Sequence, residues 1–161
     1  MVFVPLHKKE AMALEILINN DIKAAMIARD KKKLEALRAI KAGLLLEKTG
    51  RDINGGEIPE SIELKLLQKL VKQRKEAAQI YHEQNRADLA EDEEFQAGII
   101  EAYLPKQLDE ATIKAEIEKI IAETGASSMK DMGKVMGMAS TKFAGQADNK
   151  TISTLVRGLL A

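Results

Sequence analysis

The chain has 161 residues, of which 25 are basic and 25 are acidic, and aromatic residues make up 3% of it. Cysteine is absent, which excludes disulfides, thiolate catalysis and cysteine-based metal sites. His7 and His82 lie far apart in the sequence, and no apolar run approaches the ~18 residues of a membrane span. We therefore expect a soluble, cytoplasmic protein with no metal, no other cofactor and no membrane partner.

Apolar residues recur at intervals of three and four in a sequence rich in Ala, Leu, Ile, Lys and Glu, which predicts an all-α fold. A first helix is expected over about residues 6–28. A second is expected over about residues 34–50, ending at a glycine that can adopt the left-handed capping conformation. Only residues 29–33 connect these two helices, and so short a connection predicts an antiparallel hairpin. Residues 51–57 (RDINGGE) are expected to form the most flexible loop of the chain.

Two further helices are predicted over residues 59–81 and 88–103. Pro59 suits a first helical turn, and Asp88 with Glu91 resembles a capping box. Pro105 forbids continuation of the second of these helices. We therefore expect an N-terminal helical domain over residues 1–104.

A small three-helix domain is expected over residues 105–161, close to the lower size limit for independent folding. Gly125 should stop its first helix, and Gly145 lies where the chain must turn before its last helix. Helix caps are expected at polar residues that precede the apolar stripes: Asp109, Ser127 or Ser128, and Asp148.

Formal charge varies along the chain despite its overall balance. Residues 1–85 carry 16 basic and 12 acidic side chains, residues 86–124 carry 4 and 11, and residues 125–161 carry 5 and 2. Such asymmetry can orient a charged partner, although clustering of solvated helix faces is the simpler interpretation of composition alone. The acidic run 91–94 is best explained by the helix macrodipole, which favours negative charge at the start of a helix. His82 is expected to be a surface residue.

Sequence signatures of an enzyme are missing. Gly133 and Lys134 lack the upstream glycine and the preceding strand of a phosphate-binding loop. There is no dinucleotide fingerprint, no Gly-x-Ser-x-Gly elbow and no His-Glu-x-x-His motif. Four methionines at helical spacing favour core packing over an adaptable partner groove: Met129, Met132, Met136 and Met138.

Positive charge gathers near the C-terminal end, where Asp148 is the one acid between residues 133 and 150. Lysines beside a helix N-terminus with exposed N–H groups can contact phosphate, and glycines four apart on one face allow close approach. The predicted nucleic-acid-binding residues are Lys130, Gly133, Lys134, Gly137, Lys142, Lys150 and Arg157. Because aromatic residues are scarce there, contacts to the backbone of a folded RNA fit better than reading of bases.

Four blocks of sequence, in order along nearly the whole chain, resemble the GatB/YqeY-like proteins. They are LEALRAIKAGLL (34–45), QRKEAAQIYHEQNRADLAEDEE (73–94), AYLPKQL (102–108) and GASSMKDMGKVMG (125–137). The resemblance implies a helical N-terminal domain and a small helical domain similar to the tail of the B subunit of tRNA-dependent amidotransferases. That tail approaches the body of the tRNA, whereas activation and ammonia production reside elsewhere in the enzyme.

One departure from the family pattern precedes the last helix. Relatives tend to have a Lys-Gly-Lys/Arg-Ala-Asp/Asn string, whereas residues 144–148 read AGQAD here, so two expected charges are missing. Each lost phosphate contact would weaken RNA binding and its salt dependence.

We therefore expect a non-catalytic accessory protein that binds tRNA, or a complex that handles aminoacyl-tRNA, through its C-terminal domain. The alternative is a helical protein-interaction adaptor whose first four helices present a groove. A carbon–nitrogen ligase that uses glutamine as amido-N donor is implied by family association alone, because no residues of that machinery have counterparts here.

Overall fold

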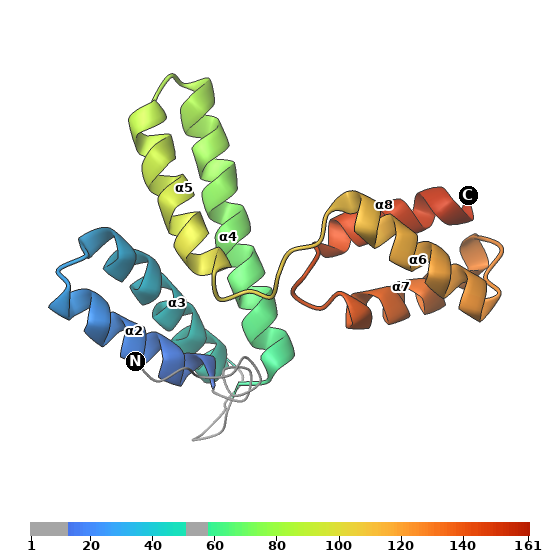
Figure 1. The fold of residues 1–161 in the computed structure, drawn as a ribbon, viewed down its shortest axis with the longest axis horizontal. Helices are drawn as coiled ribbons and strands as arrows, with labels where there is room; N and C mark the ends of the chain where they lie inside the picture. Colours follow the sequence, from blue (N-terminus) through green and yellow to red (C-terminus); the bar gives the residue numbers. More distant parts are fainter. Residues whose placement is uncertain (1–12, 51–57) are drawn as a thin grey trace. The chain divides into compact units, whose positions relative to one another are not determined.

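A computed structural model describes residues 13–50 and 58–161, and every regular element in them is helical (Figure 1). The predicted all-α class is confirmed. The elements in chain order are α2 (Leu14–Ile27), α3 (Lys31–Gly50), α4 (Glu60–Glu83), α5 (Ala87–Glu101), α6 (Glu110–Thr124), the 3₁₀ turn η1 (Met129–Asp131), α7 (Met132–Lys142) and α8 (Asn149–Leu160). His7, the first part of the expected helix 6–28 and the expected loop 51–57 lie outside the described residues.

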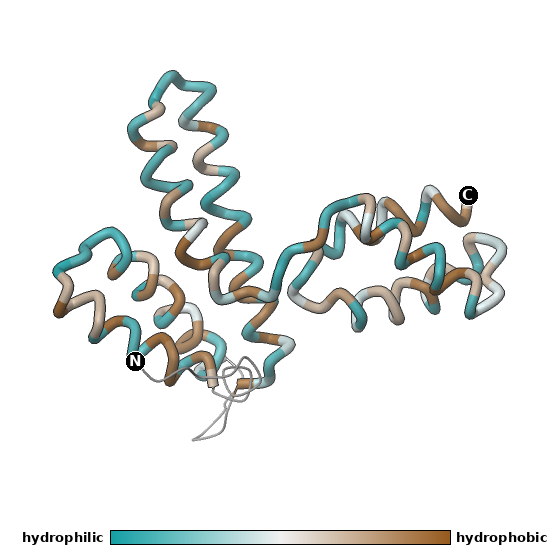
Figure 2. The backbone as a smooth tube through the Cα atoms, viewed as in Figure 1, coloured by the Kyte–Doolittle hydropathy of each residue, from teal (hydrophilic) through white to brown (hydrophobic). Residues whose placement is uncertain are grey.

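The chain divides into two compact units, which we call unit 1 (Met1–Tyr103) and unit 2 (Leu104–Ala161). Unit 1 consists of two helical hairpins, α2 with α3 and α4 with α5, and α3 packs against both helices of the second hairpin (Figure 1). Hydrophobic and hydrophilic residues alternate along the helices (Figure 2), and the buried residues of a helix recur at helical spacing, as Ala90, Ala97 and Ile100 do on α5.

Close contact between α3 and α4 depends on a glycine. A Cβ atom added at Gly43 would lie 2.7 Å from Cδ1 of Leu66, so no larger residue fits without displacing that side chain. Polar contacts link both of these helices to α5. The Arg74 Nε–H donates to Oε1 of Gln96 at 3.0 Å, and the Gln96 amide donates to Oε2 of Glu35 at 3.2 Å. Together these contacts connect α4, α5 and α3.

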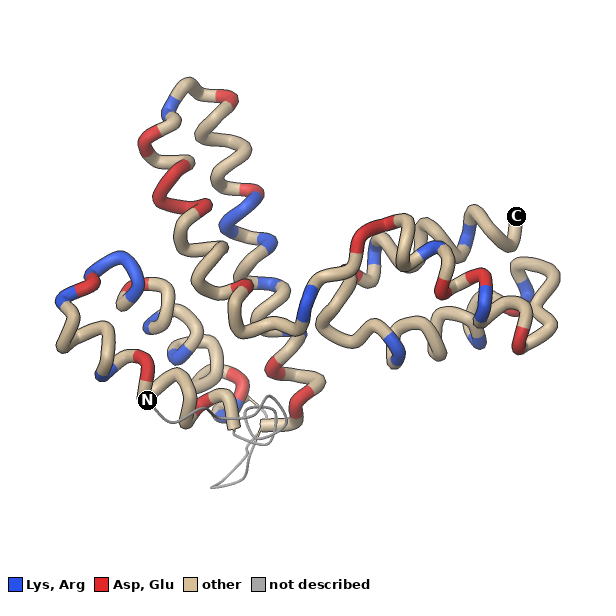
Figure 3. The backbone as a smooth tube through the Cα atoms, viewed as in Figure 1, with Lys and Arg blue, Asp and Glu red and all other residues tan. Residues whose placement is uncertain are grey.

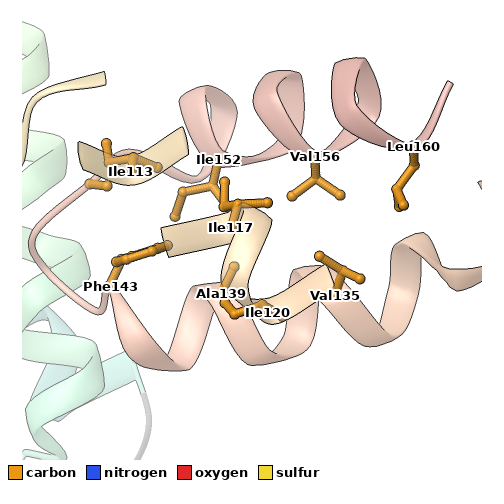
Figure 4. Close-up of a cluster of buried hydrophobic side chains, with 10 residues drawn as sticks. Ile113, Ile117, Ile120, Val135, Ala139, Phe143, Ile152, Val156 and Leu160 are labelled. Atoms are coloured by element: carbon orange, nitrogen blue, oxygen red, sulfur yellow. The ribbon is translucent and has the colours of Figure 1, made fainter. Parts of the chain in front are cut away.

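Unit 2 folds around ten buried residues from α6, α7, α8 and the turn before α8 (Figure 4). They are Ile113, Ile117, Ile120, Val135, Ala139, Phe143, Ala147, Ile152, Val156 and Leu160. They recur at three- and four-residue spacing, so each helix presents a single stripe to the shared core. The predicted stop of α6 is confirmed, because Gly125 adopts a φ of +70°.

The segment after Pro105 belongs to unit 2, because it is hydrogen-bonded to the turn between α7 and α8. The Leu108 N–H donates to the Gln146 carbonyl at 3.0 Å, and the Gln107 amide donates to the Gly145 carbonyl at 2.6 Å. Gly145 has a φ of +75°, which explains why a glycine occupies this turn.

The predicted capping box at the start of α5 is wrong. Asp88 does not cap this helix, which begins at Ala87 after Arg86. Instead, the Asp88 carboxylate accepts hydrogen bonds from Nε and Nη2 of Arg86 at 3.2 and 3.1 Å. This guanidinium is the main cause that lowers the pKa of Asp88.

Candidate nucleic-acid interface

The N-terminus of η1 and α7 is closed by two side chains. The Lys130 N–H donates to the Ser128 hydroxyl at 3.4 Å, and the Ser127 and Ser128 N–H groups donate to Oδ2 of Asp131 at 3.0 and 3.3 Å. This confirms Ser128 as the cap and adds Asp131 as its reciprocal partner. The expected exposed N–H groups are therefore partly occupied here, and a phosphate would meet side chains first.

The outward side of η1 and α7 carries four of the predicted residues. Val135 and Ala139 are buried, so Gly133, Lys134 and Gly137 fall on the exposed side of α7. Lys130 is exposed on η1. A Cβ atom added at either glycine would meet no other atom within 4 Å. The space directly above both glycines is therefore open, and close approach by a partner stays a prediction.

Lys142 differs from the other predicted phosphate contacts because it is held by an acid. Its Nζ lies 2.6 Å from Oε2 of Glu116 on α6, and Lys119 lies 3.1 Å from the other oxygen of the same carboxylate. Hydrogen bonds from Lys142 and Lys119 lower the pKa of Glu116, and the bond to Glu116 raises the pKa of Lys142. The charge of Lys142 is thus compensated locally. No local signal in the sequence pointed to Glu116.

The two remaining predicted residues lie on α8. Asp148 caps this helix as predicted, and its Oδ1 accepts from the Lys150 N–H at 3.3 Å. Ile152 and Val156 face the core, whereas Lys150 and Arg157 are exposed. The two cations are seven positions apart in the sequence, so they lie on the same side of α8, two turns apart.

The remaining predicted cations therefore form two groups, Lys130 on η1 with Lys134 on α7, and Lys150 with Arg157 on α8. Across residues 13–50 and 58–161, none of these four side chains takes part in an ion pair. Unit 2 contains eight basic and seven acidic residues, and five of the acids lie within residues 109–123, on α6 and its cap. The positive charge of unit 2 is consequently concentrated on η1, α7 and α8 (Figure 3).

The methionine prediction is correct for two of four residues. Met132 and Met136 pack against the core, whereas Met129 and Met138 are 45% and 41% exposed. Met138 lines a shallow hollow of about 410 Å³ between α6 and α7. The other residues around this hollow are Ile120, Glu123, Gly137, Thr141 and Lys142.

The acidic run 91–94 does not converge on one point. Asp92 lies 2.9 Å from the Lys32 ammonium, and Glu94 lies 2.6 Å from Nε2 of His82. His82 is exposed, as expected, although its pairing with Glu94 was not predicted.

Among the described residues, no three His, Cys, Asp or Glu side chains are grouped so that they could hold a metal ion. None of the helices in the described part of the chain is both long and apolar enough to cross a membrane.

These features define a small all-α protein in which a capped helical unit displays basic side chains on two of its helices. A family model described as Yqey-like protein matches residues 16–160, and the chain belongs to this family. The family resemblance read from the sequence is therefore confirmed.

Curated relatives include proteins named altered inheritance of mitochondria protein 41, mitochondrial. The relative from Lachancea thermotolerans is 31% identical over 113 residues, which cover 69% of this chain and 59% of the relative. The relative from Meyerozyma guilliermondii is 36% identical over 87 residues, or 54% of this chain and 44% of the relative. The relative from Clavispora lusitaniae is 34% identical over 110 residues, or 66% and 62%. The chain thus spans less than two thirds of the length of each.

Proposed function

We propose that this protein is a non-catalytic accessory protein that binds tRNA, or a complex that handles aminoacyl-tRNA, through η1, α7 and α8. One observation carries the proposal. Lys130, Lys134, Lys150 and Arg157 are exposed, and none of them has an ion-pair partner among the described residues. Exposed cations without an ion-pair partner are available to phosphate groups. The similarity of this unit to the amidotransferase tail, which approaches tRNA, supports the same partner.

The chemistry of unit 2 favours the RNA backbone over the bases. Phe143 is the one aromatic residue in unit 2, and it is 2% exposed. Stacking platforms for unpaired bases are therefore missing from the surface of this unit. Lysine and arginine side chains on rigid helices suit a folded RNA that is recognised through its shape and its phosphates.

The same geometry limits the expected affinity. The AGQAD segment lacks the basic residues found in relatives, and Lys142 is compensated by Glu116. Four cations remain on η1, α7 and α8. We therefore expect weak to moderate binding that depends strongly on salt concentration, because each neutralised phosphate contributes to the salt slope.

Binding of bulk tRNA at several salt concentrations tests the proposal. The first variant is Lys130→Ala with Lys134→Ala, and its matched control is Lys114→Ala with Lys119→Ala, which removes the same charge from α6. Affinity falls as salt concentration rises, so the slope of log affinity against log salt is negative. Loss of two phosphate contacts should make this slope shallower by about two in the first variant. The control should bind almost as the wild type does. Absence of binding at low salt, or equal loss in both variants, would contradict the proposal.

A protein-interaction adaptor is the second candidate, and exposed apolar side chains on unit 1 favour it. Ile16 is 51% exposed, Leu45 is 62% exposed and Leu46 is 72% exposed. Binding through such residues would change little with salt, whereas binding through phosphates weakens steeply. A catalytic role as a carbon–nitrogen ligase has no supporting residue constellation among the described residues.

The cellular compartment of this protein is a further part of the proposal. The sequence predicts a cytoplasmic protein, whereas the curated relatives are named as mitochondrial. Both compartments contain tRNA, so the tRNA hypothesis does not depend on which one holds this chain. Fractionation of cells that produce the full chain distinguishes them.

A further inference from the structure

The turn between α2 and α3 exposes two large apolar side chains at the end of α2. Ile27 is 85% exposed, the highest value among the exposed large hydrophobic residues of the described chain, and Met26 is 55% exposed. Figure 2 shows hydrophobic residues at this end of α2, directly before a hydrophilic turn. The turn lies at the end of the hairpin opposite to Leu14 and Gly50, because α2 and α3 run antiparallel (Figure 1).

Four basic residues follow these apolar side chains. Arg29, Lys31, Lys32 and Lys33 lie within five positions, and Figure 3 shows basic residues gathered at this turn. Lys32 is paired with Asp92 of α5 at 2.9 Å. Among the described residues no ion pair involves the other three.

The acid within this turn has a different role. Asp30 accepts the Lys33 N–H at 3.1 Å through Oδ1, and it thereby satisfies a donor at the start of α3. No acidic residue lies in the first turn of α3, although negative charge is favoured at that position. Apart from Asp30, the charges at the start of α3 are therefore opposite in sign to those that the helix dipole favours there. They place basic residues directly after the exposed Met26 and Ile27 in the chain.

We propose that the α2–α3 turn docks on the surface of an anionic lipid bilayer. Met26 and Ile27 enter the boundary between headgroups and acyl chains, and Arg29, Lys31 and Lys33 contact lipid phosphates. The exposed apolar pair favours a bilayer over RNA, since a phosphate backbone offers no apolar surface for Ile27. The expectation of no membrane partner came from the lack of a spanning segment, which a surface-bound protein does not need. This site is in unit 1 and is independent of the tRNA proposal.

Co-sedimentation of the full chain with lipid vesicles tests this inference. The vesicles contain phosphatidylcholine alone, or phosphatidylcholine mixed with phosphatidylglycerol. Binding is expected to the anionic vesicles. Ile27→Asp should reduce it by a factor of roughly ten or more, because an apolar side chain is replaced by a charge that the lipids repel. Lys31→Ala with Lys33→Ala should reduce it by a factor of about 25, at about fivefold per cation.

Matched controls are placed on α4. Ile80→Asp changes another exposed isoleucine, and Lys69→Ala with Lys72→Ala removes two exposed lysines. Both controls should bind like the wild type. Circular dichroism shows whether each variant retains the wild-type helix content, as expected for changes at exposed positions.

Several results would overturn the inference. These are equal binding to both vesicle types, unchanged binding of Ile27→Asp, or a comparable loss in the α4 controls. A variant at this turn that loses tRNA binding, in a protein that ignores vesicles, would identify an RNA contact in place of a lipid contact.

Discussion

Substitution of Phe143 by alanine should unfold unit 2 and leave unit 1 folded. Phe143 is 2% exposed, and its ring lies among the ten buried residues of the unit 2 core (Figure 4). Removal of a buried phenyl ring costs about 3–5 kcal/mol of unfolding free energy. A domain of this size has about 3–9 kcal/mol in total, at about 0.05–0.15 kcal/mol per residue. The loss is therefore comparable to the whole stability of unit 2.

The positions of the tyrosines make the two units separately observable. The chain has no tryptophan, and both of its tyrosines, Tyr81 and Tyr103, lie in unit 1. Near-ultraviolet circular dichroism of tyrosine therefore reports on unit 1 alone, whereas the far-ultraviolet signal reports on every helix. The helices α6, α7 and α8 supply roughly a third of the described helical residues. In Phe143→Ala, about that share of the far-ultraviolet signal should disappear at a temperature where the tyrosine signal is retained.

Phe95→Ala is the matched control, because Phe95 is 41% exposed on α5. Its ring contacts the Lys32 ammonium at 5.9 Å from the ring centre, so the substitution should cost below about 1 kcal/mol. Simultaneous loss of both signals in Phe143→Ala would show that the units do not fold independently. A far-ultraviolet signal and melting curve equal to those of the wild type would refute the assigned burial of the ring.

Three further predictions concern single residues. Gly125→Ala should lower the stability of unit 2 by about 1–2 kcal/mol in a urea titration, because φ is +70° and the cost is in the backbone alone. Asp148→Ala should cost about 0.5–2 kcal/mol in the same assay through loss of the α8 cap. Burial, followed by the hydrogen bond to Asp21, raises the pKa of Tyr103 above the ordinary value of about 10. The stabilisation by the neutral phenol is therefore present below pH ~10 and is lost as the pH rises through the raised pKa. Ultraviolet titration of Tyr81→Phe should show this late ionisation, and Asp21→Asn in that background should move it to lower pH.

The fold was largely predictable because its signals are local. Apolar spacing identified the helices, and the caps Asp109 and Asp148 with the stop at Gly125 identified their ends in unit 2. The capping box at Asp88 failed for an equally local reason. Arg86 lies two residues before it and forms a bidentate pair with the carboxylate, which a cap pattern does not take into account.

The candidate site was only partly predictable, because charge availability depends on tertiary contacts. Lys134 and Lys142 look equivalent in the sequence, yet Lys142 pairs with Glu116 across the α6–α7 contact. Nothing within α7 indicates this partner, which lies 26 residues away in the chain. The methionines show the same limit, since helical spacing cannot separate Met136 at the core from Met138 at the hollow.

The acids in residues 125–161 help to explain the positive charge of unit 2. Both of them, Asp131 and Asp148, are used as helix caps. The fold needs those carboxylates at those positions, and it leaves the outward sides of α7 and α8 without acids that could hold the lysines. The fold does not need cations on the outward sides of these helices, because any polar side chain would keep them solvated. Helix stability therefore accounts for the acids, and for Arg157 in the last turn of α8, where the helix dipole favours a cation. It does not account for Lys130, Lys134 and Lys150, and these three lysines are the reason for proposing a phosphate-bearing partner.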